Sequence, residues 1–252
     1  MIGVFDSGIG GLSILKALRA EMPREDFVYF ADTAHAPYGE RGDEFVAART
    51  RAVVEQLRRE HAVKALVVAC NTATAAAIHL VRAEHPDLPL VGVEPALKPA
   101  VALTRTRRIG VLATRGTLAS EKFKRLHASV ASEAEFVLQP CNGLADAIEK
   151  QDVERIEALC RSYAAAAGPW GDREGEADVM VLGCTHYPFV YDTLAAIAGP
   201  GVRLIETGEP VARQTRRMLA ATGSRADAGS GIIRLQSSGS TAQLQEAFDR
   251  WF

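Results

Sequence analysis

The stretch Leu66-Val-Val-Ala-Cys70-Asn-Thr72 and its counterpart Met180-Val-Leu-Gly-Cys184-Thr-His186 decide the fold class of this chain. In each, a short apolar run ends in a cysteine and is followed by polar residues and a helix-like segment. A buried strand that passes directly into a helix is typical of parallel α/β architecture, because the helix then covers the sheet. The pattern therefore predicts a strand-to-helix turn at each cysteine.

Similar apolar runs recur along the chain and alternate with amphipathic stretches of helical length. Between the runs we expect helices, for example over 43–60, and a last one over 241–251. In the first of these, Phe45, Ala48, Ala52, Val53 and Leu57 are predicted to share the buried face. The alternation favours an α/β fold with mostly parallel sheets flanked by helices, whose ligands bind at the carboxyl ends of the strands. The expected strands lie near 2–6, 26–31, 64–69, 89–93, 108–113, 135–138, 178–182, 203–205 and 231–236.

The opening pattern of the chain returns in its second half. Ile2-Gly-Val-Phe-Asp-Ser7 is answered by Ile109-Gly-Val-Leu-Ala-Thr114, and the cysteine stretches follow at similar intervals. Such a repeat predicts two similar lobes, each presenting one cysteine. Because no linker rich in Pro, Gly or Ser separates them, we expect the lobes to pack closely, with the active-site cleft between them. Chance recurrence of a common strand pattern is the alternative.

Length and composition exclude several classes of protein. The 252 residues are 48% apolar and 24% charged, which is typical of a folded globular protein. A net charge of -2 without a dense basic cluster leaves no footprint for nucleic acid. No apolar run approaches the roughly 20 residues of a membrane helix, and the chain opens directly on a strand-like run, without a signal-peptide pattern. We therefore expect a cytoplasmic protein without a membrane partner.

The four cysteines, at positions 70, 141, 160 and 184, form no CxxC pair, so neither a zinc site nor a redox dithiol is indicated. Cys70 and Cys184 fall at strand-to-helix turns, where backbone N–H groups bind carboxylates and lower the pKa of a thiol. A buried structural cysteine is the alternative for each. Cys141 and Cys160 are interpreted as structural.

Polar residues near these cysteines suggest supporting roles. His186, two residues after Cys184, could hydrogen-bond that thiol or donate a proton, and its alternative is a packing or capping role. Asp6 could help Cys70 exchange its proton, and Ser7 could bind substrate or cap a helix. The loop over 32–39 is interpreted either as a pocket wall or as an ordinary loop.

Glycines at positions 8, 10 and 11 raise the alternative of a dinucleotide site. Two features oppose it, because Ser13 replaces the third small residue of that fingerprint and Asp6 would lie beside the pyrophosphate. A pyridoxal site is not indicated either, since no lysine has the required sequence context.

Two thiols on facing lobes suit one reaction above others. Racemisation of an amino acid removes the α-proton from one face and returns a proton to the other, which a single base performs poorly. One thiolate and one thiol could do both and exchange roles in the reverse direction. The alternatives from different classes are a single-thiol decarboxylase or hydrolase, and a noncatalytic amino-acid-binding module.

Four ordered motifs resemble bacterial glutamate racemases of the aspartate/glutamate racemase family: DSGIGGLS at 6–13, ADTAHAPYG at 31–39, VACNTATA at 68–75 and LGCTHYP at 182–188. The resemblance implies interconversion of L- and D-glutamate for peptidoglycan synthesis, without metal or coenzyme, by a protein that is often a homodimer. It also implies that the C-terminal segment returns to the first lobe. The lobes would then be 1–95 plus 208–252, and 96–207.

At matching positions the resemblance implies that Cys70 and Cys184 are the two proton donors and acceptors. It also implies that the residues that contact substrate or assist proton transfer are Asp6, Ser7, Tyr38, Gly39, Asn71, Thr72, Thr185 and His186. The chain departs from the family pattern at Ile205-Glu-Thr-Gly208 and at His35, which leaves regulation and dimer geometry open. Aspartate and hydantoin racemases share the two-cysteine logic, so the substrate rests on the resemblance.

Overall fold

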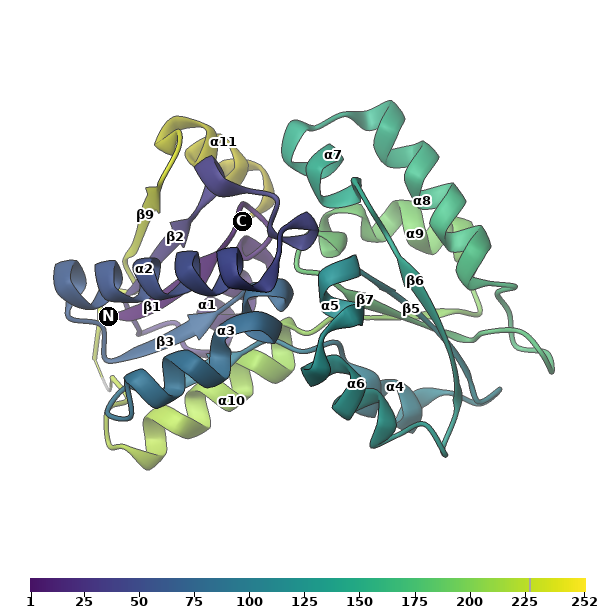
Figure 1. Ribbon diagram of the computed structural model, residues 1–252, viewed down its shortest axis with the longest axis horizontal. Helices are drawn as coiled ribbons and strands as arrows, with labels where there is room; N and C mark the ends of the chain where they lie inside the picture. Colours follow the sequence, from purple (N-terminus) through teal and green to yellow (C-terminus); the bar gives the residue numbers. More distant parts are fainter. Residues whose placement is uncertain (227) are drawn as a thin grey trace. The chain divides into compact units, whose positions relative to one another are not determined.

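The computed structural model describes residues 1–226 and 228–252. The chain divides into two compact units, one formed by Met1–Val93 and Gly208–Phe252, the other by Glu94–Thr207. Each unit contains one sheet flanked by helices (Figure 1), and every pairing between its described strands is parallel. The predicted α/β class is confirmed. No helix in the described part of the chain combines the length and apolar character that a membrane crossing requires.

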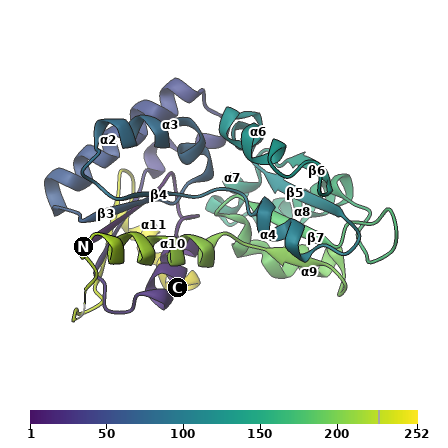
Figure 2. The same cartoon turned by 90° about the horizontal axis from the view of Figure 1, so that it is seen from below.

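The first unit is a five-stranded sheet in the order β4-β3-β1-β2-β9. Helices α2 and α3 pack on one face, and Figure 2 shows α10 on the opposite side of the strands. Strands β1, β2 and β3 are buried along their whole length because both faces are covered, which explains their continuous apolar sequences. The elements are β1 (Ile2–Asp6), α1 (Leu12–Glu21), β2 (Phe27–Ala31), two 3-10 turns η1 (Thr33–His35) and η2 (Tyr38–Glu40), α2 (Asp43–His61), β3 (Ala65–Val68), α3 (Asn71–Glu84), β4 (Leu90–Gly92), α10 (Gly208–Ala221), β9 (Ile233–Ser237) and α11 (Thr241–Trp251).

The second unit is a four-stranded sheet in the order β6-β5-β7-β8. Strands β5 and β7 lie in its centre and are buried, whereas the edge strands β6 and β8 are partly exposed. The elements are α4 (Leu97–Leu103), β5 (Arg108–Ala113), α5 (Arg115–Ala119), α6 (Glu121–Ala128), β6 (Glu135–Pro140), α7 (Leu144–Lys150), α8 (Val153–Ala167), β7 (Val179–Gly183), the 3-10 turn η3 (Tyr187–Val190), α9 (Tyr191–Ala198) and β8 (Arg203–Ile205).

Each of the nine expected strands is present, with ends that differ by two residues at most. The predicted buried face of α2 is correct for Val53 and Leu57 and wrong for Phe45, Ala48 and Ala52, which are exposed. The helix also buries Val46, Ala47, Thr50 and Val54. Alanine is tolerated on either side of a helix, so the sequence admitted two apolar faces, and packing of the branched side chains decided between them.

Gly110 on β5 is required by the packing of Trp170. A Cβ atom at position 110 would lie 2.2 Å from the Cη2 atom of Trp170. The indole is fixed in place because its Nε1 donates a hydrogen bond to the Ala164 carbonyl oxygen at 2.7 Å. Relief of the clash would therefore require movement of a strand or of α8.

Gly110→Ala is expected to lower the free energy of unfolding by about 1–3 kcal/mol, the usual cost of overpacking a core. Urea denaturation measures this change. Gly201→Ala is the matched control, because among the described residues, its two chain neighbours aside, no heavy atom lies within 4 Å of the Cβ position there. Equal stability of the two variants would contradict the packing described for β5.

Candidate active site

Parallel strands in the first unit bring chemically active residues to one edge of the sheet. Asp6 is the last residue of β1, and Cys70 follows β3, which pairs with β1. Asp32 follows β2 on the other side of β1, and its amide donates a hydrogen bond to the Asp6 carbonyl oxygen at 2.9 Å. This edge is the place where open parallel sheets bind ligands.

Cys70 is the N-cap residue of α3, so its thiol meets the positive end of that helix. Its Sγ accepts a hydrogen bond from the Ala73 amide at 3.4 Å, and its side chain is almost completely buried. Backbone N–H groups and the helix dipole both favour negative charge on a sulfur atom in this position. The predicted strand-to-helix turn at Cys70 is confirmed.

Asp6, Ser7 and Cys70 form a continuous hydrogen-bonded chain. The Cys70 thiol donates to the Ser7 hydroxyl oxygen at 3.7 Å, and that hydroxyl donates to Asp6 Oδ1 at 3.2 Å. The same carboxylate oxygen accepts the Gly8 amide at 2.8 Å. Ser7 does not cap α1, because the N-cap of that helix is Gly11, four positions later in the chain. The chain connects the thiol to a fully buried carboxylate, a suitable path for a proton.

Asn71 presents an unusual pair of polar atoms. Its side-chain Oδ1 and Nδ2 are both buried, and neither has a hydrogen-bond partner among the described residues. An unpaired buried amide costs free energy, and such groups require an explanation in a native protein. Since Asn71 follows Cys70 directly, its amide is well placed to bind a polar ligand beside the thiol. Thr72, the next residue, is buried as well.

Tyr38 and Gly39 lie in η2, which follows β2. The Tyr38 ring is buried, and its hydroxyl donates to Asp32 Oδ2 at 2.5 Å. Burial and the neighbouring Asp32 carboxylate raise the pKa of Tyr38 far above its ordinary value, so the hydroxyl keeps its proton. Gly39 is half-buried.

In the second unit, a cysteine, a histidine and a glutamate form a hydrogen-bonded series. Cys184 follows β7, and its Sγ lies 3.7 Å from His186 Nδ1. His186 Nε2 lies 2.6 Å from the Glu149 carboxylate of α7. Cys184 and His186 are almost completely buried, as is Thr185 between them.

The surroundings of His186 favour its protonated form. Burial alone would lower the pKa of His186, but the hydrogen bonds with Cys184 and Glu149 outweigh it and raise this pKa well above the ordinary value of 6.5. A protonated imidazole can donate to the Glu149 carboxylate and to the Cys184 sulfur at once. It thereby places a positive charge beside the Cys184 sulfur.

The other two cysteines are buried thiols with raised pKa values. Burial raises the pKa of the Cys160 thiol to about 11, and burial raises that of Cys141 even further. Both thiols are therefore protonated at neutral pH. Within the described residues, no group of three or more His, Cys, Asp or Glu side chains is arranged to hold a metal ion.

Local sequence patterns located some of these residues and missed others. Asp6, Cys70 and Cys184 each mark a strand end, and His186 was identified by its closeness to Cys184. Glu149 was not expected, because it lies 37 positions before His186 on a separate helix. Its helix carries several charged residues, so nothing in the sequence distinguishes this glutamate from a solvated one.

The fold and the site define an α/β protein with one acid–base-partnered thiol in each of two units, an arrangement suited to proton transfer. Residues 12–215 match the Asp/Glu/Hydantoin racemase family. The chain is 48% identical to a glutamate racemase of Ralstonia nicotianae, over 97% of this chain and 86% of the relative. The chain therefore belongs to the Asp/Glu/Hydantoin racemase family.

Solved structures of relatives agree with this membership. A glutamate racemase isoform from Bacillus anthracis matches with a TM-score of 0.87 and 29% identity, over 100% of this chain and 93% of that one. Escherichia coli glutamate racemase, solved with L-glutamate and the activator UDP-MurNAc-ala, matches with a TM-score of 0.83 and 31% identity, over 99% and 94%. An aspartate racemase from Picrophilus torridus, 13% identical over 88% of this chain and 94% of that one, shares the fold with a TM-score of 0.55.

Glu149→Gln is expected to lower the pKa of His186, because the substitution removes the negative charge that faces Nε2. A titration of the histidine ring followed by NMR measures the midpoint directly. Glu157→Gln, on an exposed position of α8, is the control and should leave the midpoint unchanged.

The raised pKa also determines the sign of a stability effect. A histidine whose pKa is higher in the folded state adds stability that is complete below its unfolded pKa and is lost as the pH rises through the folded value. The loss of unfolding free energy caused by Glu149→Gln should therefore be largest near about pH 6 and should shrink at higher pH. A loss that grows with pH would contradict the charge assignment.

Proposed function

We propose that this protein is a glutamate racemase that interconverts L- and D-glutamate without a cofactor, by a two-cysteine, two-base proton transfer. One observation carries the mechanism: each unit buries a thiol and gives it an acid–base partner of its own. These partners are Ser7 and Asp6 for Cys70, and His186 and Glu149 for Cys184. The names of its relatives support glutamate as substrate.

The proposed reaction moves two protons in sequence across one carbon atom. The thiolate of one cysteine takes the α-proton and becomes a thiol, which leaves an electron pair on the carbon. The thiol of the other cysteine gives its proton to the opposite face and becomes a thiolate. The enantiomer leaves, and the two sulfur atoms have exchanged their protonation states. The reverse direction uses the same groups in opposite roles.

The two thiols reach their reactive states by different means. In the proposal, the N-terminus of α3 stabilises the Cys70 thiolate, and Ser7 conducts protons between its sulfur and the Asp6 carboxylate. The protonated His186 ring, hydrogen-bonded to Glu149, stabilises the Cys184 thiolate. Asp6 and His186 therefore act as assisting acid–base groups, and Cys70 and Cys184 as the groups that touch the α-carbon.

Substrate binding is assigned to polar groups beside the thiols. The buried amide of Asn71, which has no partner among the described residues, supplies a donor and an acceptor for the amino acid. Ser7, Thr72 and Thr185 add hydroxyl groups, and the Tyr38-Gly39 turn completes the set. Hydrogen bonds that strengthen as charge develops on the substrate would stabilise the carbanion-like transition state.

Several features of the proposal concern the setting of the reaction. We expect the D-glutamate to supply peptidoglycan synthesis, in a cytoplasmic enzyme that forms a homodimer. Aspartate and hydantoins are the alternative substrates, as the breadth of the family allows. Assays with the enantiomers of both amino acids in parallel distinguish glutamate from aspartate.

Cys70→Ser and Cys184→Ser are each expected to reduce kcat/KM for racemisation by about 100-fold or more, because general acid–base groups contribute about 10²–10⁴-fold. Circular dichroism of D-glutamate during incubation follows the reaction. Cys160→Ser is the control, because Cys160 is a buried cysteine on α8 whose thiol has no hydrogen-bond partner among the described residues, and this variant should retain activity.

The two single variants also separate the alternatives. Near-normal racemisation by either variant would rule out a two-base reaction and favour a single-thiol enzyme. Binding of glutamate by the unaltered protein without any loss of optical activity would favour a binding module.

Deuterium oxide provides an independent test of two opposed bases. Early in the reaction, the product enantiomer should carry solvent deuterium at its α-carbon, while recovered substrate keeps its hydrogen. The reason is that each thiol holds a single proton, so a proton taken from substrate returns unexchanged on the same face. Mass spectrometry of the separated enantiomers measures both values. Equal deuterium in recovered substrate and product would indicate one base acting on both faces.

A further inference from the structure

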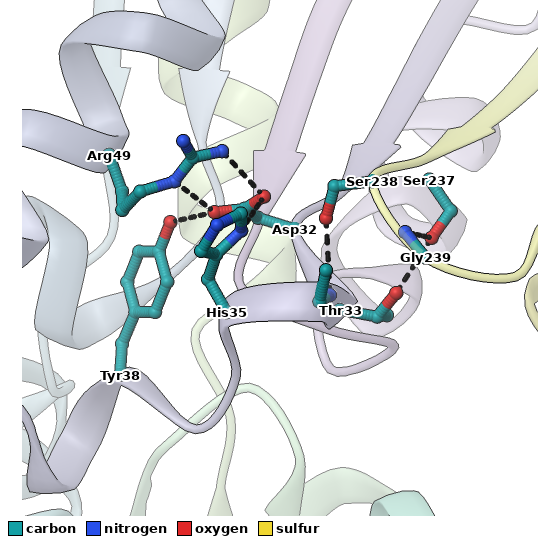
Figure 3. Close-up of polar contacts among 9 residues, drawn as sticks. Asp32, Thr33, His35, Tyr38, Arg49, Ser237, Ser238 and Gly239 are labelled. Atoms are coloured by element: carbon teal, nitrogen blue, oxygen red, sulfur yellow. Dashed lines mark hydrogen bonds and ion pairs between the residues drawn. The ribbon is translucent and has the colours of Figure 1, made fainter.

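Asp32, the residue that follows β2, is a completely buried carboxylate with an unusual number of partners. Figure 3 shows the side chains of Arg49, Tyr38 and His35 gathered around it. Arg49 reaches both oxygens, with Nε at 2.9 Å and Nη2 at 3.0 Å. Tyr38 donates to Oδ2, and His35 Nδ1 lies 3.0 Å from Oδ1.

These contacts keep Asp32 ionised although it is buried. Burial alone would raise the pKa of Asp32, but hydrogen bonds from Arg49, Tyr38, Ser238 and His35 lower it below the ordinary value. A paired arginine fork has one preferred geometry, and a buried charge that lost its partners would be costly. The Asp32 carboxylate therefore determines the positions of the side chains that bind it.

Tyr38 is held in place through its hydroxyl group and through its ring. Its hydroxyl is committed to Asp32, and its ring meets the edges of Phe5 and Phe45 at centroid distances of 6.3 Å. The hydroxyl thus acts as a tether for the turn that carries Tyr38 and Gly39.

The same loop is attached a second time, to the C-terminal part of the chain. The hydroxyls of Thr33 and Ser237 lie 2.7 Å apart, and the Ala34 amide donates to Ser238 Oγ at 3.1 Å. Figure 3 shows Thr33, Ser237 and Ser238 beside the Asp32 cluster. The approach is close, because a Cβ atom at Gly239 would lie 2.6 Å from Thr33 Oγ1. Strand β9, which pairs with β2, brings Ser237 and Ser238 to this position.

We propose that Asp32 is a positioning residue for substrate binding, which anchors the loop 33–40 through Tyr38 and Arg49, with Ser238 as a second anchor from the C-terminal segment. The inference rests on the proposed function, in which Tyr38 and Gly39 contact glutamate. Asp32 itself touches no substrate. It acts by keeping the turn in its binding geometry before substrate arrives, so that binding does not have to order it.

The test compares Asp32→Asn, Tyr38→Phe and Ser238→Ala with a matched control, Asp26→Asn. Asp26 precedes the same strand and accepts hydrogen bonds from Ile232 and Ser230, so it joins β2 to the β9 segment at the opposite end of the sheet. Its substitution reports on stability without altering the anchored loop. Tyr38→Phe removes a single oxygen atom and keeps the buried ring, so it remains informative if Asp32→Asn fails to fold.

Two measurements are made on each variant. Hydrogen–deuterium exchange in the absence of substrate should be faster over residues 33–41 in Asp32→Asn and Tyr38→Phe, and unchanged there in Asp26→Asn. For both enantiomers of glutamate, KM should rise about tenfold while kcat changes by less than about threefold, the pattern of lost binding rather than lost chemistry. Ser238→Ala should show the same pattern with a smaller rise. The double variant Asp32→Asn/Tyr38→Phe should be no worse than the worse single variant, because both remove one tether.

The outcomes separate this inference from the function on which it rests. Unchanged exchange over 33–41 in Asp32→Asn and Tyr38→Phe, in an enzyme that still racemises glutamate, overturns the anchoring role alone. Faster exchange with unchanged KM also overturns it, because the loop would then not serve binding. Absence of racemisation by the unaltered protein overturns the proposed function, whatever the exchange shows.

Discussion

Parallel strands bring their carboxyl ends to one edge of a sheet, and in the first unit that edge carries ionisable side chains that are almost completely buried. Asp6 ends β1 and Asp32 directly follows the neighbouring strand β2, and neither side chain has exposed surface. A charge in that position is tolerated only when hydrogen bonds and counter-charges surround it. The surrounding groups, Ser7 and Gly8 at Asp6 and Arg49 at Asp32, therefore have fixed positions. Burial of charge therefore dictates which groups surround this edge.

Under the proposed reaction, the two thiols are stabilised as thiolates in two different ways. Cys70 is placed at a helix N-terminus, where main-chain donors favour its anionic form. Cys184 depends on a side chain, because His186 can carry the positive charge and Glu149 stabilises that charge from behind. The first arrangement is encoded locally, in the turn after β3. The second needs a helix that comes 34 or more positions earlier in the chain, since α7 ends at Lys150.

This difference explains how much of the protein the sequence could predict. Strand ends follow from short apolar runs, so the strands and the residues after them, such as Cys70 and Cys184, were predicted. Glu149 and Arg49 lie on helices and acquire their roles only through tertiary contact, which no local pattern records. The sequence does not indicate a role for Asp32 for the same reason, because its main counter-charge lies 17 positions away. The buried face of α2 was misjudged in part because alanine fits solvent and core equally well.

The two thiols have different surroundings, although the substrate and product of the proposed reaction have equal free energy. The two facts are compatible. Enantiomers have the same free energy in water, so the equilibrium constant of a racemisation is one, and kcat/KM must be identical in both directions. Under the proposed reaction, a Ser7–Asp6 path on one side and a His186–Glu149 pair on the other cannot change that ratio. They can only determine which enantiomer binds more tightly and is converted more slowly. An equilibrium constant of one therefore does not require the groups beside the two thiols to be alike.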